Sequence, residues 1–158
     1  MSLEIERKFL MEDFPNLPCM REVYIEQGYL SIEPEVRIHK AIDKQSGKQD
    51  FRLTVRGNGT LTRTEIKTDV EEAFYKEAVE LLGLPMIKKE YKSYTYEGYV
   101  LEVCYVDAGM ESAFFYGEIE FPSEEEANTF QKPYFLGKEV TMEDDYKMKN
   151  YWKRTRGV

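Results

Sequence analysis

The chain has 158 residues, a length that suits one domain spanning residues 1–158 with a core of its own. Its 22 basic and 30 acidic residues give a net charge of −8, which argues against nonspecific nucleic-acid binding. No secretory signal and no membrane-spanning apolar stretch are visible, so we expect a cytoplasmic protein that does not bind membranes. Cys19 and Cys104 lack metal-ligand spacing and disulfide density, and we expect free thiols. Cys104 shares a strand face with Glu102; we expect it to pack in the core, with a position facing a charged interior as the alternative.

Charged and apolar residues alternate over residues 4–9, close to the start of the chain. In a strand this pattern places Glu4, Glu6 and Lys8 on one face and Ile5 on the other. Two carboxylates at this spacing repel each other unless a cation lies between them, and hard divalent cations prefer oxygen ligands. The stretch therefore predicts a metal site, with a solvated strand face as the alternative.

The same alternation recurs in four later stretches, where one polar face is strongly basic and another strongly acidic. If these strands close into an antiparallel barrel, their charged faces can point outward around an apolar core or inward into a cavity. Charged faces that point outward would have no common role. An inward arrangement would bind a polyanion through Arg and Lys, and the Glu side chains would hold a cation bridging its phosphates. The residues on these faces are Arg37 and His39; Arg52, Thr54 and Arg56; Arg63, Glu65 and Lys67; Glu118 and Glu120.

The pattern predicts an α+β fold, mainly antiparallel β, with a few peripheral helices; that eight strands form a closed barrel is what the family resemblance described below implies. A capping box at Thr68–Glu71 predicts a helix that ends at Gly83. Ser123 begins a shorter helix stopped by Pro133, and a last helix starts near Thr141 and runs through Trp152. The strands are expected over residues 2–11, 22–32, 35–43, 49–57, 60–67, 87–97, 99–107 and 113–121.

Several short motifs, taken in chain order, resemble the CYTH superfamily of triphosphate tunnel metalloenzymes. The resemblance spans nearly the whole chain, and it implies an eight-stranded antiparallel tunnel whose members hydrolyse or cyclise triphosphate compounds with a divalent metal. The motifs are Glu4-x-Glu6-x-Lys8, Gln27-Gly28-Tyr29-Leu30, Val36-Arg37-Ile38, Leu53-Thr54-Val55-Arg56-Gly57, Arg63-x-Glu65, Glu118-Ile119-Glu120-Phe121 and Leu136-Gly137-Lys138-Glu139-Val140-Thr141.

The resemblance also implies roles for individual residues. Glu4, Glu6 and Glu120 match the metal ligands of the family, here for Mg²⁺ or Mn²⁺, and Glu118 and Glu65 are further acidic positions for the metal. Tyr29 is either an orienting hydroxyl beside the catalytic Glu4, Glu6, Lys8 and Arg37, or a core tyrosine. The residues that match the triphosphate clamps are Lys8, Arg37, Arg56, Arg63 and Lys89, and Arg52 joins them because it shares the strand face of Arg56.

Four positions depart from the family pattern. His39 stands where an arginine is typical, Lys67 where a glutamate is common, and Cys104 where an acidic residue is frequent. Tyr91 lies in the segment Lys88–Lys92, where the usual Lys-x-Arg motif is blurred. A neutral His39 lowers the basic charge of the wall by one, and Lys67 restores it.

The resemblance implies a metal-dependent hydrolase of triphosphate compounds. We expect inorganic tripolyphosphate as the substrate, because no stretch has the spacing of an adenine pocket and base discrimination needs placed hydrogen-bond partners. A class IV-type adenylate cyclase and a thiamine triphosphatase remain alternatives among enzymes. A triphosphate- or polyphosphate-binding module without turnover is the alternative outside them. The sequence makes no prediction of oligomeric state.

Overall fold

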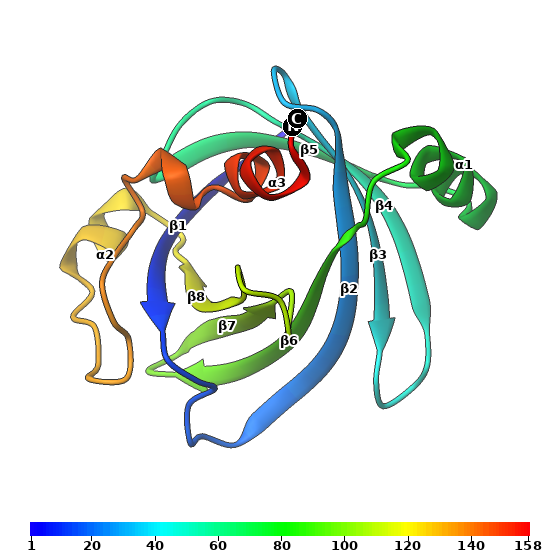
Figure 1. The fold of residues 1–158 in the computed structure, drawn as a ribbon. Helices are drawn as coiled ribbons and strands as arrows, with labels where there is room; N and C mark the ends of the chain where they lie inside the picture. The colour runs from blue at the N-terminus through cyan, green and yellow to red at the C-terminus, as the bar shows by residue number, and fades with distance from the viewer.

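Eight antiparallel strands close into a barrel in the computed structural model, which describes residues 1–158 (Figure 1). Around the barrel the strand order is β1-β5-β4-β3-β2-β6-β7-β8, so that β1 pairs with both β5 and β8 and completes the ring. The predicted fold is confirmed. The strands are β1 (Ser2–Met11), β2 (Cys19–Ser31), β3 (Glu35–Asp43), β4 (Gln49–Arg56), β5 (Thr62–Asp69), β6 (Ile87–Tyr96), β7 (Tyr99–Val106) and β8 (Phe114–Glu120).

Three α-helices lie around this barrel, and one turn of 3₁₀ helix, η1 (Asp144–Tyr146), precedes the last of them. Helix α1 (Glu72–Leu82) contacts β2, β3 and β4, α2 (Glu124–Thr129) contacts β1, and α3 (Met148–Arg156) contacts β2 (Figure 1). None of the helices is long and apolar enough to cross a membrane.

The hydrophobic core is divided into two clusters, because the alternating strands send their charged side chains into the barrel and their apolar ones outward. The first cluster lies beneath α1 and α3 and includes Ile38 and Trp152. The second lies against α2 and includes Phe9, Ile119 and Phe130. Burial outside the barrel thus stabilises a wall whose inner surface is free to be polar.

Helix α3 is seated on the barrel by close packing and by a buried ion pair. Gly28 permits the approach, since a Cβ there would lie 2.8 Å from the sulfur of Met86 and 3.1 Å from the Trp152 ring. Arg156 Nη1 lies 2.7 Å from Asp107 Oδ2, and the Tyr151 hydroxyl donates to the same oxygen at 2.6 Å. These contacts fix the C-terminal segment at one end of the barrel.

Several predicted boundaries were wrong, each for a local reason. The capping box at Thr68–Glu71 does not form, because β5 continues to Asp69 and Glu71 precedes α1 without a side-chain cap. The predicted end at Gly83 is confirmed by its left-handed backbone, φ 63°. Ser123 does cap α2, but this helix ends at Thr129, before Pro133. The last helix starts at Met148 rather than near Thr141, after the η1 turn.

Candidate active site

Two cavities of about 80 Å³ and 270 Å³ lie inside the barrel. The C-terminal segment Val140–Met148 lines the smaller cavity, and the larger one opens beside Arg21, Asp50 and Lys67. The same six side chains line both, so the cavities are neighbouring parts of one tunnel that meet at a charged waist. These residues are Glu6, Arg37, Arg56, Lys89, Tyr116 and Glu118.

Carboxylates from β1 and β8 crowd together on one side of this waist. Strand register places Glu6 opposite Glu120 and Lys8 opposite Glu118. Burial, together with the nearby carboxylates of Glu118 and Glu4, raises the pKa of Glu6 well above its usual range. Burial also acts to raise the pKa of Glu118, but the Lys8 ammonium acts together with Glu6, Lys89 and Arg56 to outweigh it, and the pKa falls to about 2. In this acidic wall, negative charge on Glu6 is therefore disfavoured beside the charged Glu118.

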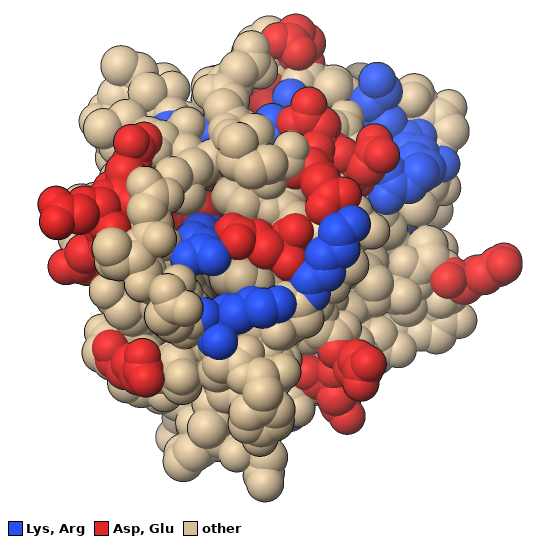
Figure 2. All heavy atoms as spheres, turned by 90° about the vertical axis from the view of Figure 1, so that its left-hand side faces the viewer, with Lys and Arg blue, Asp and Glu red and all other residues tan.

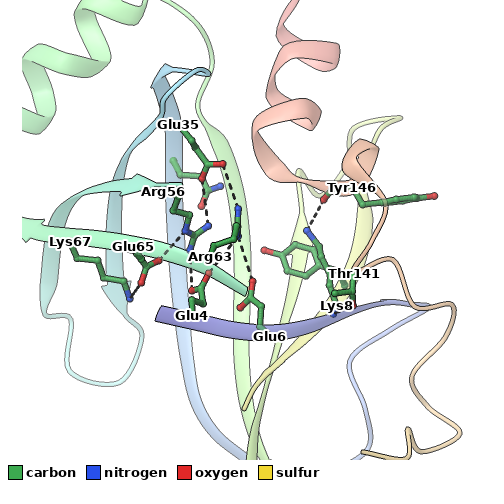
Figure 3. A network of polar contacts seen from close by, with 12 residues as sticks. Glu4, Glu6, Lys8, Glu35, Arg56, Arg63, Glu65, Lys67, Thr141 and Tyr146 are labelled. Atoms are coloured by element: carbon green, nitrogen blue, oxygen red, sulfur yellow. Dashed lines mark hydrogen bonds and ion pairs between the residues drawn. The ribbon is translucent and has the colours of Figure 1, made fainter. Parts of the chain in front are cut away.

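A network of ion pairs joins this acidic wall to β4 and β5 (Figure 3). Arg56 donates from Nε to Glu65 Oε2 at 2.9 Å and lies 3.5 Å from Glu4 Oε2. Arg63 lies 3.5 Å from Glu4 Oε1 and 3.8 Å from Glu6 Oε1. Glu35, at the start of β3, approaches Arg56 within 3.8 Å and Arg63 within 3.6 Å. Both arginines are thus held by carboxylates on several sides.

Three further basic side chains of the tunnel make no ion pair with a carboxylate. Arg37 makes no side-chain hydrogen bond or ion pair, and its Nε is buried. Lys8 donates to the backbone oxygen of Tyr146 at 2.7 Å (Figure 3), and Lys89 donates to the Tyr116 hydroxyl at 2.5 Å. Burial, together with the positive charge of Arg37, lowers the pKa of Lys89 to about 8. We call these three cations, Lys8, Arg37 and Lys89, the unpaired wall.

The wider end of the tunnel carries a mixed set of charges. Arg52 is 37% exposed and lies 3.6 Å from Asp69, and Lys67 pairs with Glu65 at 3.1 Å. Burial lowers the pKa of His39 to about 2, and Arg37 and Lys89 act in the same direction, so this imidazole is neutral. Figure 2 shows one face of the molecule on which Lys and Arg side chains lie beside Asp and Glu side chains around a hollow.

All the residues predicted for the site line the tunnel or its ion-pair network, but in different surroundings. The position of Tyr29 is compatible with both an orienting hydroxyl and a core tyrosine. Its side chain lines the narrower cavity, and its ring centroid lies 6.1 Å from that of Trp152. Glu120 is exposed at the wider end. Cys104 fits both of the positions considered for it, since it is buried in the first core cluster and also lines the wider cavity.

Sequence reasoning missed several tunnel residues, Glu35, Glu102 and Tyr116 among them, and most of one segment. Glu35, Glu102 and Tyr116 each lie two positions from a residue that was recognised, so the period of two along their strands was a usable signal. Burial raises the pKa of Glu102 to about 7, and Glu118 contributes to this shift. No local pattern could place Val140–Met148 at the tunnel, because it lies there through the long-range docking of α3.

The acidic wall has the chemistry of a cation site although its side chains do not enclose one. No three acidic, histidine or cysteine side chains lie close enough to form a ready-made metal cluster. However, Glu4 Oε1 is buried without a hydrogen bond, and Glu6 is held among other carboxylates. Oxygen ligands with unbalanced negative charge fit a hard divalent cation.

No model of a known protein family matches the chain. Curated proteins do match over most of its length, and two of them are named inorganic triphosphatase. The one from Nitrosomonas europaea is 34% identical over 149 residues, which cover 92% of this chain and 94% of that protein. The one from Acetivibrio thermocellus is 28% identical over 155 residues, 97% of this chain and 95% of that protein.

Solved structures are similar over the same region. The crystal structure of the inorganic triphosphatase NE1496 aligns with a TM-score of 0.66 and 28% identity, covering 93% of this chain and 95% of that one. The PH1819 protein of Pyrococcus horikoshii has a TM-score of 0.55 and 18% identity over 79% of this chain and 82% of that one, which shows a common fold. With near-complete coverage of a relative at 34% identity, and with the charged tunnel in place, the chain belongs to the inorganic triphosphatases of the CYTH superfamily.

Proposed function

We propose that the protein hydrolyses inorganic tripolyphosphate inside the tunnel, with Mg²⁺ or Mn²⁺ bound by the acidic wall. The observation that carries this proposal is the unpaired wall of Lys8, Arg37 and Lys89. Three buried or half-buried cations that make no direct ion pair are costly unless an anion joins them. A linear polyanion in the tunnel would supply that charge through hydrogen bonds to the guanidinium and ammonium groups. The family to which the chain belongs supports the same substrate class.

The metal would be held by carboxylates of the acidic wall. Glu4 and Glu6 are the first candidates, because one has an oxygen without a hydrogen bond and the other has a raised pKa. Glu118 and Glu120 flank them from β8, and Glu65 lies beyond Arg56. A bound divalent cation neutralises phosphate charge and acts as a Lewis acid on a phosphoryl oxygen.

In the proposed reaction, water attacks the terminal phosphorus, the bridging phosphorus–oxygen bond breaks, and orthophosphate and diphosphate leave. The work of this chain is mainly electrostatic, as in other phosphoryl transfers. Arg37 and Lys89 stabilise negative charge on the transferred group and on the departing diphosphate. Lys8 binds the phosphate chain at the narrower end of the tunnel, where the backbone oxygen of Tyr146 accepts a hydrogen bond from the Lys8 ammonium group.

The surroundings of the tunnel favour a substrate made of phosphate alone. The narrower cavity is lined largely by charged side chains, and at about 80 Å³ it leaves little room for a nucleoside. The wider cavity is also strongly charged, with Arg21, Asp50, Arg52 and Lys67 at its opening. Discrimination of a base requires placed hydrogen-bond partners, and these side chains suit phosphate better. ATP and thiamine triphosphate would therefore bind mainly through their phosphates.

Phosphate release tests this proposal directly. Purified protein is incubated with tripolyphosphate, ATP or thiamine triphosphate, with Mg²⁺, with Mn²⁺ or with a chelator, and orthophosphate and cyclic AMP are measured. We expect release from tripolyphosphate to exceed release from the two organic substrates and to stop with chelator. Cyclic AMP as the main product from ATP would favour a cyclase. Tight tripolyphosphate binding without release under any metal would favour a binding module.

A further inference from the structure

Tyr116 is the one neutral side chain that touches both lysines of the unpaired wall. It lies on β8 with its side chain 2% exposed, and it lines both parts of the tunnel. Its hydroxyl accepts a hydrogen bond from Lys89 Nζ at 2.5 Å. Its ring faces Lys8, whose Nζ lies 4.2 Å from the ring centroid. Lys89 itself lies 5.1 Å from the same centroid.

These contacts matter because two ammonium groups beside one ring repel each other. A hydrogen-bond acceptor and an aromatic face are the two ways in which a neutral side chain can stabilise a nearby cation without neutralising it. A carboxylate at this position would pair with the lysines and compete with phosphate. Tyr116 instead leaves the positive charge of Lys8 and Lys89 available, and it restricts where each ammonium group lies.

We propose that Tyr116 is a positioning residue that aims Lys8 and Lys89 at the same phosphate chain. The proposal deepens the function proposed above and rests on it. The hydroxyl fixes Lys89 from β6, and the ring fixes Lys8 from β1, so the two clamps keep their spacing before substrate arrives. Preorganised charges bind an anion more tightly than mobile ones, since less ordering is needed on binding. Tyr116 therefore acts on substrate affinity through the lysines.

The first experiment removes the hydroxyl alone. In Tyr116→Phe the ring stays and the acceptor for Lys89 is lost, and we expect the KM for tripolyphosphate with Mg²⁺ to rise about fivefold, the worth of one hydrogen bond. A variant that merely folds less well would lower the active fraction and kcat while leaving KM unchanged. Tyr105→Phe is the matched control, because Tyr105 lies on β7 and stacks on Phe115. We expect its KM to equal that of the wild type.

A double-mutant cycle then asks whether Tyr116 acts through Lys89. We expect Tyr116→Phe to have no further effect on KM in a Lys89→Met background, because the donor of the hydrogen bond is already gone. An equal effect in both backgrounds would overturn the inference, and so would a KM for Tyr116→Phe within twofold of the wild type. Tyr116→Leu, which also removes the ring, should raise KM beyond Tyr116→Phe.

A measurement without substrate separates this inference from the proposed function. In NMR spectra of protein with ¹⁵N-labelled lysine, the Lys89 ammonium signal should shift in Tyr116→Phe and stay in place in Tyr105→Phe. If the wild type neither binds nor hydrolyses tripolyphosphate, the proposed function fails, and the signal still reports on the contact. An unshifted Lys89 signal in Tyr116→Phe would overturn the positioning role even in an active enzyme.

Discussion

Two walls of the same tunnel use arginine and lysine in opposite ways. On β4 and β5, Arg56 and Arg63 are surrounded by Glu4, Glu35 and Glu65, with separations from 2.9 to 3.8 Å. On β1, β3 and β6, the three cations of the unpaired wall make no direct ion pair, and the hydrogen bonds of Lys8 and Lys89 go to neutral groups. Both sets have the same strand spacing in sequence. The difference teaches that spacing identifies a tunnel residue, whereas its partners decide between binding and structural roles.

The comparison also predicts how each wall responds to mutation. A cation that already has carboxylate partners contributes to stability, and its removal leaves those carboxylates buried without a counter-charge. A cation without carboxylate partners contributes to ligand binding, and we expect its removal to stabilise the ligand-free protein. Activity and stability should therefore separate along the two walls.

The largest effect on turnover is expected at Glu6, where the acidic wall meets the waist. Glu6→Gln keeps the shape of the side chain and removes one charge from the proposed metal site, so metal-dependent phosphate release should fall below detection. Its thermal stability should not fall at pH 7. The folded state raises the pKa of Glu6, so ionisation above its ordinary value of 4.5 disfavours folding, and Gln removes that effect. Wild-type activity in this variant would remove Glu6 from the metal site.

Arg37→Ala tests the unpaired wall. We expect kcat/KM for tripolyphosphate to fall about 100- to 1000-fold, because one donor to a transferred phosphoryl group is lost. The melting temperature should stay the same or rise, since an unpaired buried cation is removed. Steady-state kinetics and thermal unfolding of one preparation measure both. Unchanged kinetics would place Arg37 outside the phosphate path.

Arg56→Ala tests the wall on β4 and β5, where Arg56 and Arg63 are ion-paired. In contrast to Arg37→Ala, we expect this change to lower stability. The change leaves Glu4, Glu35 and Glu65 without a shared partner, and we expect a loss of about 3–5 kcal/mol in the free energy of unfolding. Denaturant unfolding of this variant beside Arg37→Ala measures the contrast. Equal destabilisation by the two substitutions would break the comparison between the walls.

The pH dependence of binding sharpens the contrast, because Lys89 has a pKa of about 8. The ammonium form predominates below that pH and is lost above it, so KM for tripolyphosphate should rise as pH increases through about 8. Lys89→Arg keeps its charge throughout this range. We expect the rise in KM to disappear in that variant. A rise that persists in Lys89→Arg would assign the titration to another group.

The smallest effect is expected at Arg52, at the wider end of the tunnel. This side chain is partly exposed and pairs weakly with Asp69, so it is screened by solvent. We expect Arg52→Ala to raise KM only about two- to fivefold and to leave kcat unchanged, an effect that added salt reduces. A fall in kcat/KM as large as that expected for Arg37→Ala would indicate that the phosphate chain binds at the wider end of the tunnel.

The fold was predictable because β1, β3, β4, β5 and β8 show a period of two in the sequence and because the family resemblance implied a closed eight-stranded barrel. A half-buried strand shows that period locally, and the predicted strand ranges agree with the structure to within a few residues. The start of α3 was not predictable, because Asp107, Tyr151 and Arg156 fix it across long sequence separations. Local signals also misplaced the start of α1, where the pairing of β4 with β5 carries the strand to Asp69.

The site was predictable as a set of residues but not as an arrangement. The sequence grouped Arg37, Arg56 and Arg63 together as clamps, and alternation alone cannot show that two of them are paired. Glu35 makes that distinction through its contacts with Arg56 and Arg63. In the sequence, Glu35 shows only that it shares a strand face with Arg37; nothing there indicates that it contacts Arg56 and Arg63. Part of this pairing is a property of the closed barrel, since Glu4 on β1 meets Arg56 on β4 and Arg63 on β5.

The most direct test of the central claim is a crystal structure with tripolyphosphate bound. We predict phosphate oxygens within hydrogen-bonding distance of Arg37, Lys89 and Lys8, in a tunnel where Arg56 keeps its contact with Glu65. Tripolyphosphate bound outside the tunnel would contradict the account. So would tripolyphosphate that displaces Glu65 from Arg56 while Arg37 remains without a partner.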